Sequence, residues 1–310
     1  MTTALISLQN LTVSYGKFHA LKNLSLSLEQ GSIGLLGPNG AGKSTLIKTL
    51  LGLLPFIKGE VEILGWNVKK SPLEIRKNVG YVPEGDAYLP GISVVQFLTF
   101  LGQLSGMVER DALKRSHEVL EYVGLGEERY RKMEDLTHGQ RSRIKLAQAL
   151  CHDVKLLILD EPTDGMDPVG RENFLSLVKR IREQAYFSVL LASHTLEDVE
   201  YLCDKIVLIQ DGEILAQKNL LEWFEGREKN YIVDLHGESS SFLQQCEQEK
   251  VFVEKLTETQ CILHGVQDTQ KIFRLAYAAK VGICGLYLWK PTLESMFIQM
   301  VKEKSKRIVS

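Results

Sequence analysis

The amino-acid sequence predicts an α/β fold that combines a core domain, an antiparallel β subdomain and a helical insert with a small C-terminal α+β domain. Strand-like apolar runs alternate with helical patterns through the first two thirds of the chain, as in a sheet covered by helices. After about Glu225 the expected order changes to β-α-β-β-α-β, which favours a separate unit. We therefore expect domains over residues 1–225 and 226–310, with the helical insert at about 92–150.

Length, composition and charge set the broad class. A chain of 310 residues has room for one large domain and one small domain. Its 44% hydrophobic and 25% charged residues are ordinary for a globular protein, which argues against a disordered chain. The net charge of −2 gives no field that would attract nucleic acid, so we expect no nucleic-acid partner. Five scattered cysteines without a C-x-x-C pair favour reduced thiols in the cytosol.

No segment of the sequence predicts passage through a membrane. The N-terminal residues have neither the basic region nor the apolar region of a secretory signal. No apolar run reaches the length of about 18 residues that a spanning helix needs. Any role at a membrane therefore requires a partner.

The N-terminal elements read as strands followed by a glycine loop. Alternating apolar residues in LISLQNLTVSY (5–15) and LSLSLEQG (24–31) predict half-buried, antiparallel strands. SIGLLG (32–37) is a compact apolar strand that ends in glycine, and STLIKTLLGLL (44–54) follows as a helix. Strand, glycine loop and helix in this order open an α/β nucleotide-binding fold.

The later part of the core supplies further strands. VGYVPE (79–84) is a short strand, and KLLILDE (155–161) is a continuous apolar run suited to a central parallel strand. FSVLLASH (187–194) and KIVLIQDGEIL (205–215) add strands, with a helix at about 170–184 before them.

The C-terminal region follows the ferredoxin-like plan. We expect strands in YIVDLHG, VFVEKL, CILHG and GICGLYLW, and helices in SSFLQQCEQE, DTQKIFRLAYAAK and a closing segment that begins at Pro291. This order matches the split β-α-β arrangement, although its helices would also be able to pack against the core.

The loop GPNGAGKST fits G-x-x-x-x-G-K-[ST] and lies between a strand and a helix, as a P-loop NTPase core requires. Its glycines allow backbone N–H groups to surround phosphate oxygens, and the following helix directs its positive end at the same anion. Lys43 is expected on the β and γ phosphates, and the Ser44 hydroxyl on Mg²⁺. The candidate nucleotide-binding residues of the loop are Gly37, Pro38, Asn39, Gly40, Ala41, Gly42, Lys43, Ser44 and Thr45.

LLILDEPT supplies the second half of a hydrolytic site. Asp160 ends an apolar strand, where it is expected to hold the Mg²⁺ water shell. Glu161 follows directly and is the candidate group that orients or deprotonates the attacking water. His194, just after the strand FSVLLA, is placed to contact the γ-phosphate and hold Glu161.

The stretch LTHGQRSRIKLAQAL (136–150) joins a polar glycine turn to a basic, amphipathic helix. We expect the helix to begin at Gln140, where free N–H groups carry partial positive charge. Arg141, Arg143 and Lys145 read most simply as a solvated face.

Taken in order, these motifs resemble the ATP-binding-cassette (ABC) ATPases over about Leu5 to Leu221. In that family the turn and helix form the signature motif, usually L-S-G-G-Q, which binds the γ-phosphate of ATP held by a second subunit. The resemblance places Thr137, Gly139 and Gln140 in this role, with His138 where the family usually has glycine.

The resemblance assigns three more residues. Tyr15 matches the aromatic residue that stacks on adenine. Glu84 falls where the family usually has a glutamine that ligates Mg²⁺ and senses the membrane partner. Asp167, in DGMDP, matches the loop that communicates across the dimer.

The resemblance implies an ATPase that uses ATP and Mg²⁺ and pairs with a second copy or a related ABC subunit. The chain would lie in the cytoplasm, peripheral on the inner face of the membrane, and drive separate integral membrane permease subunits. The C-terminal KPTLESMFIQMV resembles the P-S-L-E-D-V-F ending of export ATPases, which favours export of a substrate.

Two other function classes compete with this interpretation. Soluble cassette ATPases that act on ribosomes or DNA usually carry two cassettes or a long coiled-coil insert, and this sequence has neither. A P-loop kinase acting on a metabolite would leave the LTHGQ turn without a role. Co-purification with a polytopic membrane protein would favour the transporter ATPase, whereas sedimentation with ribosomes would favour the soluble cassette ATPase.

Overall fold

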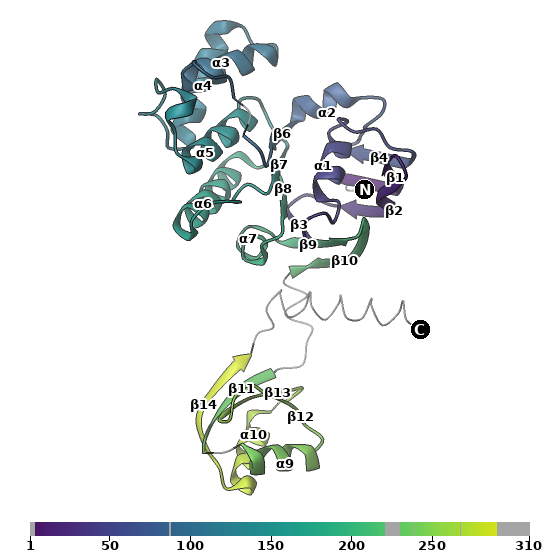
Figure 1. Ribbon diagram of the computed structural model, residues 1–310, viewed down its shortest axis with the longest axis vertical. Coiled ribbons are helices and arrows are strands. Elements are labelled where there is room, and N and C mark those ends of the chain that lie inside the picture. The colour runs from purple at the N-terminus through teal and green to yellow at the C-terminus, as the bar shows by residue number, and fades with distance from the viewer. Residues whose placement is uncertain (1–3, 87, 221–229, 238, 267, 290–310) are drawn as a thin grey trace. The chain divides into compact units, whose positions relative to one another are not determined.

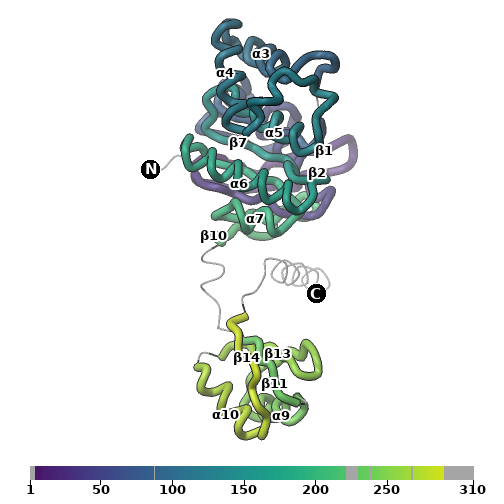
Figure 2. The backbone as a smooth tube through the Cα atoms, turned by 90° about the vertical axis from the view of Figure 1, so that its left-hand side faces the viewer, coloured from purple at the N-terminus to yellow at the C-terminus, as the bar shows by residue number. Residues whose placement is uncertain are grey.

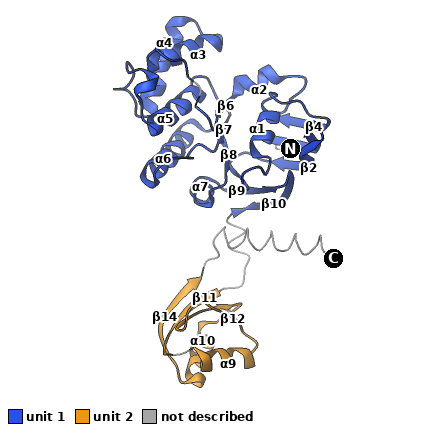
Figure 3. Cartoon of the chain, in the orientation of Figure 1, with its two compact units in different colours: residues 1–220 blue, residues 221–310 orange. Residues whose placement is uncertain are grey.

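The computed structural model divides into two compact units, residues 1–220 and 221–310 (Figure 3). It describes residues 4–86, 88–220, 230–237, 239–266 and 268–289. The division falls near the boundary expected at 225, which itself lies outside the described residues. Each unit has its own apolar core.

An antiparallel sheet opens unit 1, as the alternating apolar residues predicted. Its strands are β1 (Ile6–Tyr15), β2 (Phe18–Leu28), β4 (Lys58–Ile63) and β5 (Trp66–Asn67), in the order β2-β1-β4-β5. Leu24, Leu26 and Leu28 of β2 are buried, whereas the serines between them are exposed. This period of two directs one face of the sheet into the core. Strands β4 and β5 were not predicted from the sequence.

The second sheet of unit 1 positions the candidate site. Its strands are β3 (Ser32–Leu36), β6 (Val79–Val82), β7 (Leu156–Asp160), β8 (Ser188–Ser193), β9 (Lys205–Gln210) and β10 (Glu213–Asn219). The order is β10-β9-β3-β8-β7-β6, and only β10 pairs antiparallel. Every residue of β3, β7 and β8 is buried, as expected for parallel strands covered on both faces.

Helices cover both faces of this sheet. Helices α5 (His138–Ala149), α6 (Pro168–Ala185) and α7 (Leu196–Leu202) lie on one face, while α1 (Lys43–Leu50) and the antiparallel sheet lie on the other (Figures 1 and 2). A shorter helix, α2 (Pro72–Asn78), precedes β6. Because β3, β8 and β7 are adjacent and parallel, the loops after them meet at one edge, where α/β sheets bind ligands.

A helical insert between β6 and β7 contains α3 (Val94–Leu104), α4 (Glu109–Tyr122), a 3₁₀ turn (Met133–Asp135) and α5. Ser93 caps α3 through a capping box with Gln96. The insert therefore occupies the region in which helical spacing predicted it.

The prediction that Lys145 lies on a solvated face of α5 is wrong, because its side chain is buried. Its Nζ donates to the carbonyl oxygens of Pro83 (3.2 Å) and Glu84 (3.1 Å) and lies 3.2 Å from Asp86 Oδ1. The Nε of Arg141 lies 2.9 Å from the other carboxylate oxygen of Asp86. These cations tie α5 to the loop that follows β6, because a buried ammonium requires such partners.

Unit 2 confirms the ferredoxin-like plan. It contains β11 (Asn230–His236), α9 (Ser240–Gln248), β12 (Phe252–Lys255), β13 (Gln260–His264), α10 (Thr269–Ala279) and β14 (Gly282–Trp289). Its antiparallel sheet has the order β12-β13-β11-β14, in which β13 separates β11 from β12. Val233, Leu263 and Phe242 contribute to the core between the sheet and its two helices. The closing helix expected from Pro291 lies outside the described residues.

In the described part of the chain, every helix is too short or too polar to cross a membrane.

Candidate active site

The loop between β3 and α1 forms a cradle whose glycines are required by close packing. Gly42 has a φ of 109°, and a Cβ there would lie 2.8 Å from Leu21 Cδ2 and 3.1 Å from the Ala20 carbonyl oxygen. A Cβ on Gly37 would lie 2.2 Å from the carbonyl oxygen of Ile209. A side chain at either position would push the loop off the strands beneath it, so only glycine fits this conformation. In the remainder of the motif, Pro38, Asn39 and Gly40 are exposed, Ala41 is buried, and Thr45 lies in the first turn of α1.

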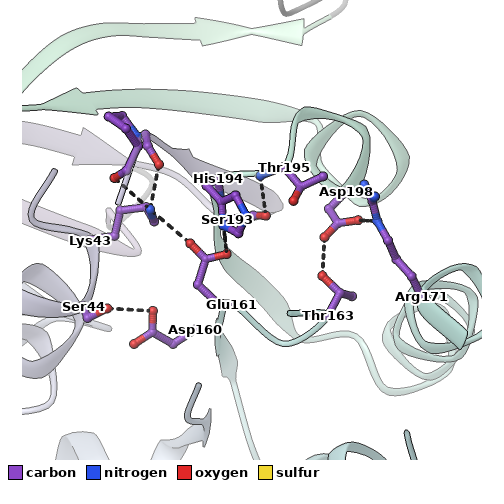
Figure 4. Close-up of polar contacts among 12 residues, drawn as sticks. Lys43, Ser44, Asp160, Glu161, Thr163, Arg171, Ser193, His194, Thr195 and Asp198 are labelled. Carbon is purple, nitrogen blue, oxygen red and sulfur yellow. Dashed lines mark hydrogen bonds and ion pairs between the residues drawn. The ribbon is translucent and has the colours of Figure 1, made fainter. Parts of the chain in front are cut away.

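Lys43 places its ammonium group inside this loop. Its side chain is buried, and Nζ donates to the carbonyl oxygens of Gly37 (2.6 Å) and Pro38 (3.2 Å). The same nitrogen lies 3.0 Å from Glu161 Oε1 (Figure 4). A cation held at the N-terminal end of a helix is suited to a phosphate, because the ammonium and the helix dipole have the same sign there.

Ser44 and Asp160 meet on the other side of the cradle. The Ser44 hydroxyl donates to Asp160 Oδ1 at 3.2 Å, and the Tyr81 hydroxyl donates to Asp160 Oδ2 at 3.4 Å. Burial raises the pKa of Asp160, and the carboxylates of Glu84 and Glu161 raise it further. Charge repulsion of this kind is relieved by a bound cation.

These donors fit Mg²⁺. In the described residues, no three His, Cys, Asp or Glu side chains gather into a complete metal site. Mg²⁺ usually takes one or two protein oxygens together with waters and substrate phosphates. The hydroxyl of Ser44 and the carboxylate of Asp160 are oxygen ligands of that type, adjacent to the cradle.

Glu161 lies between Lys43 and His194 in a strained backbone conformation. Its φ is 47°, in the left-handed region that non-glycine residues seldom adopt, and such strain is typical of functional sites. The backbone N–H of Glu161 donates to the Ala192 carbonyl oxygen at 2.9 Å, which fixes it beside β8. His194 contacts Glu161 Oε2 twice, through Nδ1 at 2.8 Å and through its backbone N–H at 3.2 Å (Figure 4). Lys43, Glu161 and His194 therefore form one connected group.

The LTHGQ turn is built differently from the cradle. Helix α5 begins at His138, not at Gln140 as expected, because Thr137 and Gln140 form a capping box. A Cβ on Gly139 would meet no atom within 4 Å, so none of the described residues packs against this position. His138 Nε2 lies 3.0 Å from the carbonyl oxygen of Asp164, and accordingly the ring donates to the loop after β7.

The remaining predicted residues lie on separate elements. Tyr15 ends β1, with 49% of its side chain exposed. Glu84 follows β6, and its carboxylate is close enough to Asp160 to raise the pKa of that residue. Asp167 is exposed and occupies the N-cap position of α6.

A buried polar cluster lies beside Glu161, and local sequence patterns did not predict it. Asp198 in α7 is fully buried and accepts hydrogen bonds from the Thr163 hydroxyl and from Arg171 Nε. Thr163 belongs to the LLILDEPT motif, but the sequence gives no sign that a residue of α7 reaches it. Tyr81, which contacts Asp160, was read only as part of a strand.

Comparison with known proteins places the chain in a family. The family model described as ABC transporter matches residues 21–164. The linearmycin resistance ATP-binding protein LnrL of Bacillus subtilis is 41% identical over 68% of this chain and 68% of its own length. The bacitracin transport ATP-binding protein BcrA of Bacillus licheniformis is 33% identical over 69% of this chain and 70% of its own length.

Two further comparisons cover different extents of the chain. An uncharacterized ABC transporter ATP-binding protein of Bacillus subtilis, YhaQ, is 30% identical over 96% of this chain and 98% of its own length, so the match includes unit 2. The solved structure of cbiO1 from Clostridium perfringens, part of the ABC transporter complex cbiONQ, has a TM-score of 0.65 and 26% identity over 71% of this chain and 90% of that chain. The chain belongs to the ABC transporter family and is an ABC-type ATPase.

Proposed function

We propose that this ATPase powers the export of a substrate through separate membrane permease subunits. The observation that carries the proposal is the open space in front of Gly139 at the N-terminal end of α5, which no described residue of this chain fills. A helix N-terminus with an open glycine is suited to an anion brought by another molecule. The similarity to LnrL and BcrA, named for linearmycin resistance and bacitracin transport, favours export.

In the proposed reaction the cradle binds the triphosphate of ATP. Backbone N–H groups of residues 37 and 39–45 would surround the phosphates, and Lys43 would contact the β and γ phosphates. Mg²⁺ bound by Ser44 and Asp160, with Glu84 beside them, would neutralise phosphate charge. The 3.0 Å contact between Lys43 and Glu161 would loosen as Lys43 turns to the phosphates. Glu161 would then be able to accept a proton from the attacking water.

His194 would complete the site by holding Glu161 and contacting the γ-phosphate. Its two contacts with Glu161 Oε2 support this arrangement. The exposed ring of Tyr15 is available to stack on adenine. The strand β2 contacts the cradle through Ala20 and Leu21, which brings the β1–β2 hairpin to this side of the site.

Hydrolysis would require two subunits, which are identical or related. Thr137, Gly139 and Gln140 of one subunit would cap the γ-phosphate that the cradle of the other subunit holds. Asp167 would contact the partner from the adjacent loop. Closure on ATP and reopening after hydrolysis would drive the permeases through the Glu84 loop and the helical insert, at the inner face of the membrane. The ties from Lys145 and Arg141 to this loop support its movement together with α5.

The experiment places a charge on the open glycine. In a Glu161→Gln background, Gly139→Asp should bind ATP as a monomer but should not pair in gel filtration with ATP. Gly139→Asn, which has the same size without the charge, should pair more than Gly139→Asp. Full pairing by Gly139→Asp would overturn the proposed role of the turn.

A second experiment tests the membrane partner. The wild-type chain, co-expressed with a polytopic membrane protein encoded beside it, should co-purify with that protein. Recovery of the chain entirely with ribosomes would favour the alternative class of soluble cassette ATPase.

A further inference from the structure

A fully buried carboxylate lies in the first turn of α7, the helix that follows His194. Asp198 has 0% of its side chain exposed. A buried charge is strongly unfavourable unless it is paired and hydrogen-bonded. Both of its oxygens are used, because Oδ2 accepts from the Thr163 hydroxyl and Oδ1 accepts from Arg171 Nε (Figure 4).

The two partners of Asp198 come from segments with different roles. Thr163 lies two residues after Glu161, on the loop that leaves β7. Arg171 lies in the first turns of α6, whose N-cap is the exposed Asp167. One carboxylate therefore joins the helix after His194, the loop after Glu161 and the helix that starts at Asp167.

A second contact limits the movement of α7 toward the sheet. Val199 packs against β3 at Gly34, where a Cβ would lie 2.4 Å from Val199 Cγ1. The turn before the helix is also held, since the backbone N–H of Thr195 donates to the buried Ser193 hydroxyl at 2.9 Å. Because α7 packs on β3, the hydrogen bonds from Thr163 and Arg171 to Asp198 fix the position of α7 relative to α6 and the loop that contains Glu161. His194 lies in the turn before α7, between Ser193 and Thr195.

We infer that Asp198 is a positioning residue that transmits contact at Asp167 to the Glu161–His194 pair. A partner subunit that presses on Asp167 would shift the start of α6 and, through Arg171 and Asp198, both Thr163 and α7. Hydrolysis would in this way be favoured only when the second subunit is in place. The inference rests on the proposed pairing of two subunits, and Asp198 itself contacts neither ATP nor water.

The first test compares two acidic neighbours on α7. Asp198→Asn keeps the shape of the side chain but removes its charge, and kcat should fall about tenfold or more because small misplacements of reacting groups are costly. The KM for ATP should change less than about twofold, since the cradle is untouched. Glu197→Gln is the matched control: its carboxylate is 76% exposed and also pairs with Arg171, at 3.3 Å, and its kcat should stay within about twofold of wild type.

The second test is a double-mutant cycle between Asp167→Ala and Asp198→Asn. If contact is transmitted through Asp198, the effects on kcat should not multiply, and the double variant should match the slower single variant within about twofold. Independent, multiplied effects would overturn the inference, because a residue that only stabilises the fold would show them. Rates are expressed per ATP-binding chain, so that loss of folded protein does not enter.

If the Asp198→Asn variant does not fold, Thr163→Val takes its place in the double-mutant cycle with Asp167→Ala. It removes only the hydroxyl that donates to Asp198, and valine has nearly the same volume as threonine. The two hypotheses also fail differently. A wild-type chain that never pairs on ATP would contradict the proposed function, whereas normal pairing together with multiplied effects would contradict only the role of Asp198.

Discussion

The cradle and the LTHGQ turn both present glycine and a helix N-terminus, yet the chain packs them in opposite ways. At Gly37 and Gly42 an added Cβ would collide with the strands beneath the loop. At Gly139 it would meet nothing within 4 Å. The cradle's cation is likewise buried and held by carbonyl oxygens and Glu161, whereas Thr137 is exposed. Packing within the fold therefore requires glycine at Gly37 and Gly42, whereas the described residues place no such requirement on Gly139, for which we propose contact with a ligand from another subunit.

The largest expected effect is on kcat, and it comes from Glu161 beside the cradle. Glu161→Gln should lower kcat by roughly 10²–10⁴ because the amide cannot accept a proton from water. Binding of ATP should persist, and pairs of subunits should accumulate with bound ATP. Steady-state ATPase assays and gel filtration measure both results. Wild-type turnover in this variant would remove Glu161 from the reaction.

The next effect separates binding from turnover. Lys43→Ala should weaken ATP binding by roughly 10–100-fold, because hydrogen bonds to charged groups are the stronger ones. The same substitution at Lys48, in the last turn of α1 and exposed, serves as the control. Titration calorimetry gives the two affinities. An unchanged affinity for Lys43→Ala would contradict the cradle assignment.

Replacing glycine with alanine in both the cradle and the LTHGQ turn tests the difference in packing directly. Gly42→Ala should lower the free energy of unfolding by about 1–3 kcal/mol, since its φ is unfavourable for alanine and the Cβ would collide with Leu21. Gly139→Ala should change that free energy by less than about 0.5 kcal/mol, because the position is helical and open. Urea unfolding without nucleotide measures both. Equal destabilisation would show that the turn is also packed by its own chain.

The smallest effect lies in the cap of α5. Thr137→Ala removes the acceptor for the Gln140 N–H and should cost about 1 kcal/mol, whereas Thr137→Ser should cost much less. If the cap also presents the helix tip to a partner, Thr137→Ala should raise the ATP concentration needed for pairing. Pairing curves in the Glu161→Gln background measure this. Identical curves for alanine and serine would limit the cap to local stability.

Local patterns predicted much of the fold. The apolar run ending in Asp160 predicted a buried parallel strand, and β7 is buried throughout. The alternation around Leu24 predicted an antiparallel strand, and β2 confirms it. The order of elements in unit 2 predicted its ferredoxin-like plan, and the sheet of unit 2 agrees with it. These features depend on short-range periodicity, which the sequence displays directly.

The features that the sequence did not predict depend on distant partners. Lys145 has the spacing of a surface residue, and its burial follows from Asp86 and two carbonyl oxygens in another loop. Asp198 lies in a helix too short to show an apolar period, so its link to Thr163 is visible only in three dimensions. The start of α5 is a different case. Thr137 and Gln140 have the spacing of a capping box, so the start at His138 was available from the sequence.

The most direct test of the account is an experimental structure of the Glu161→Gln chain with ATP and Mg²⁺, together with its pairing subunit. We predict that the N–H groups beside Gly139 of one subunit lie within hydrogen-bonding distance of the γ-phosphate held by Lys43 of the other. A structure in which each subunit encloses its own ATP, with Gly139 facing solvent, would contradict the account.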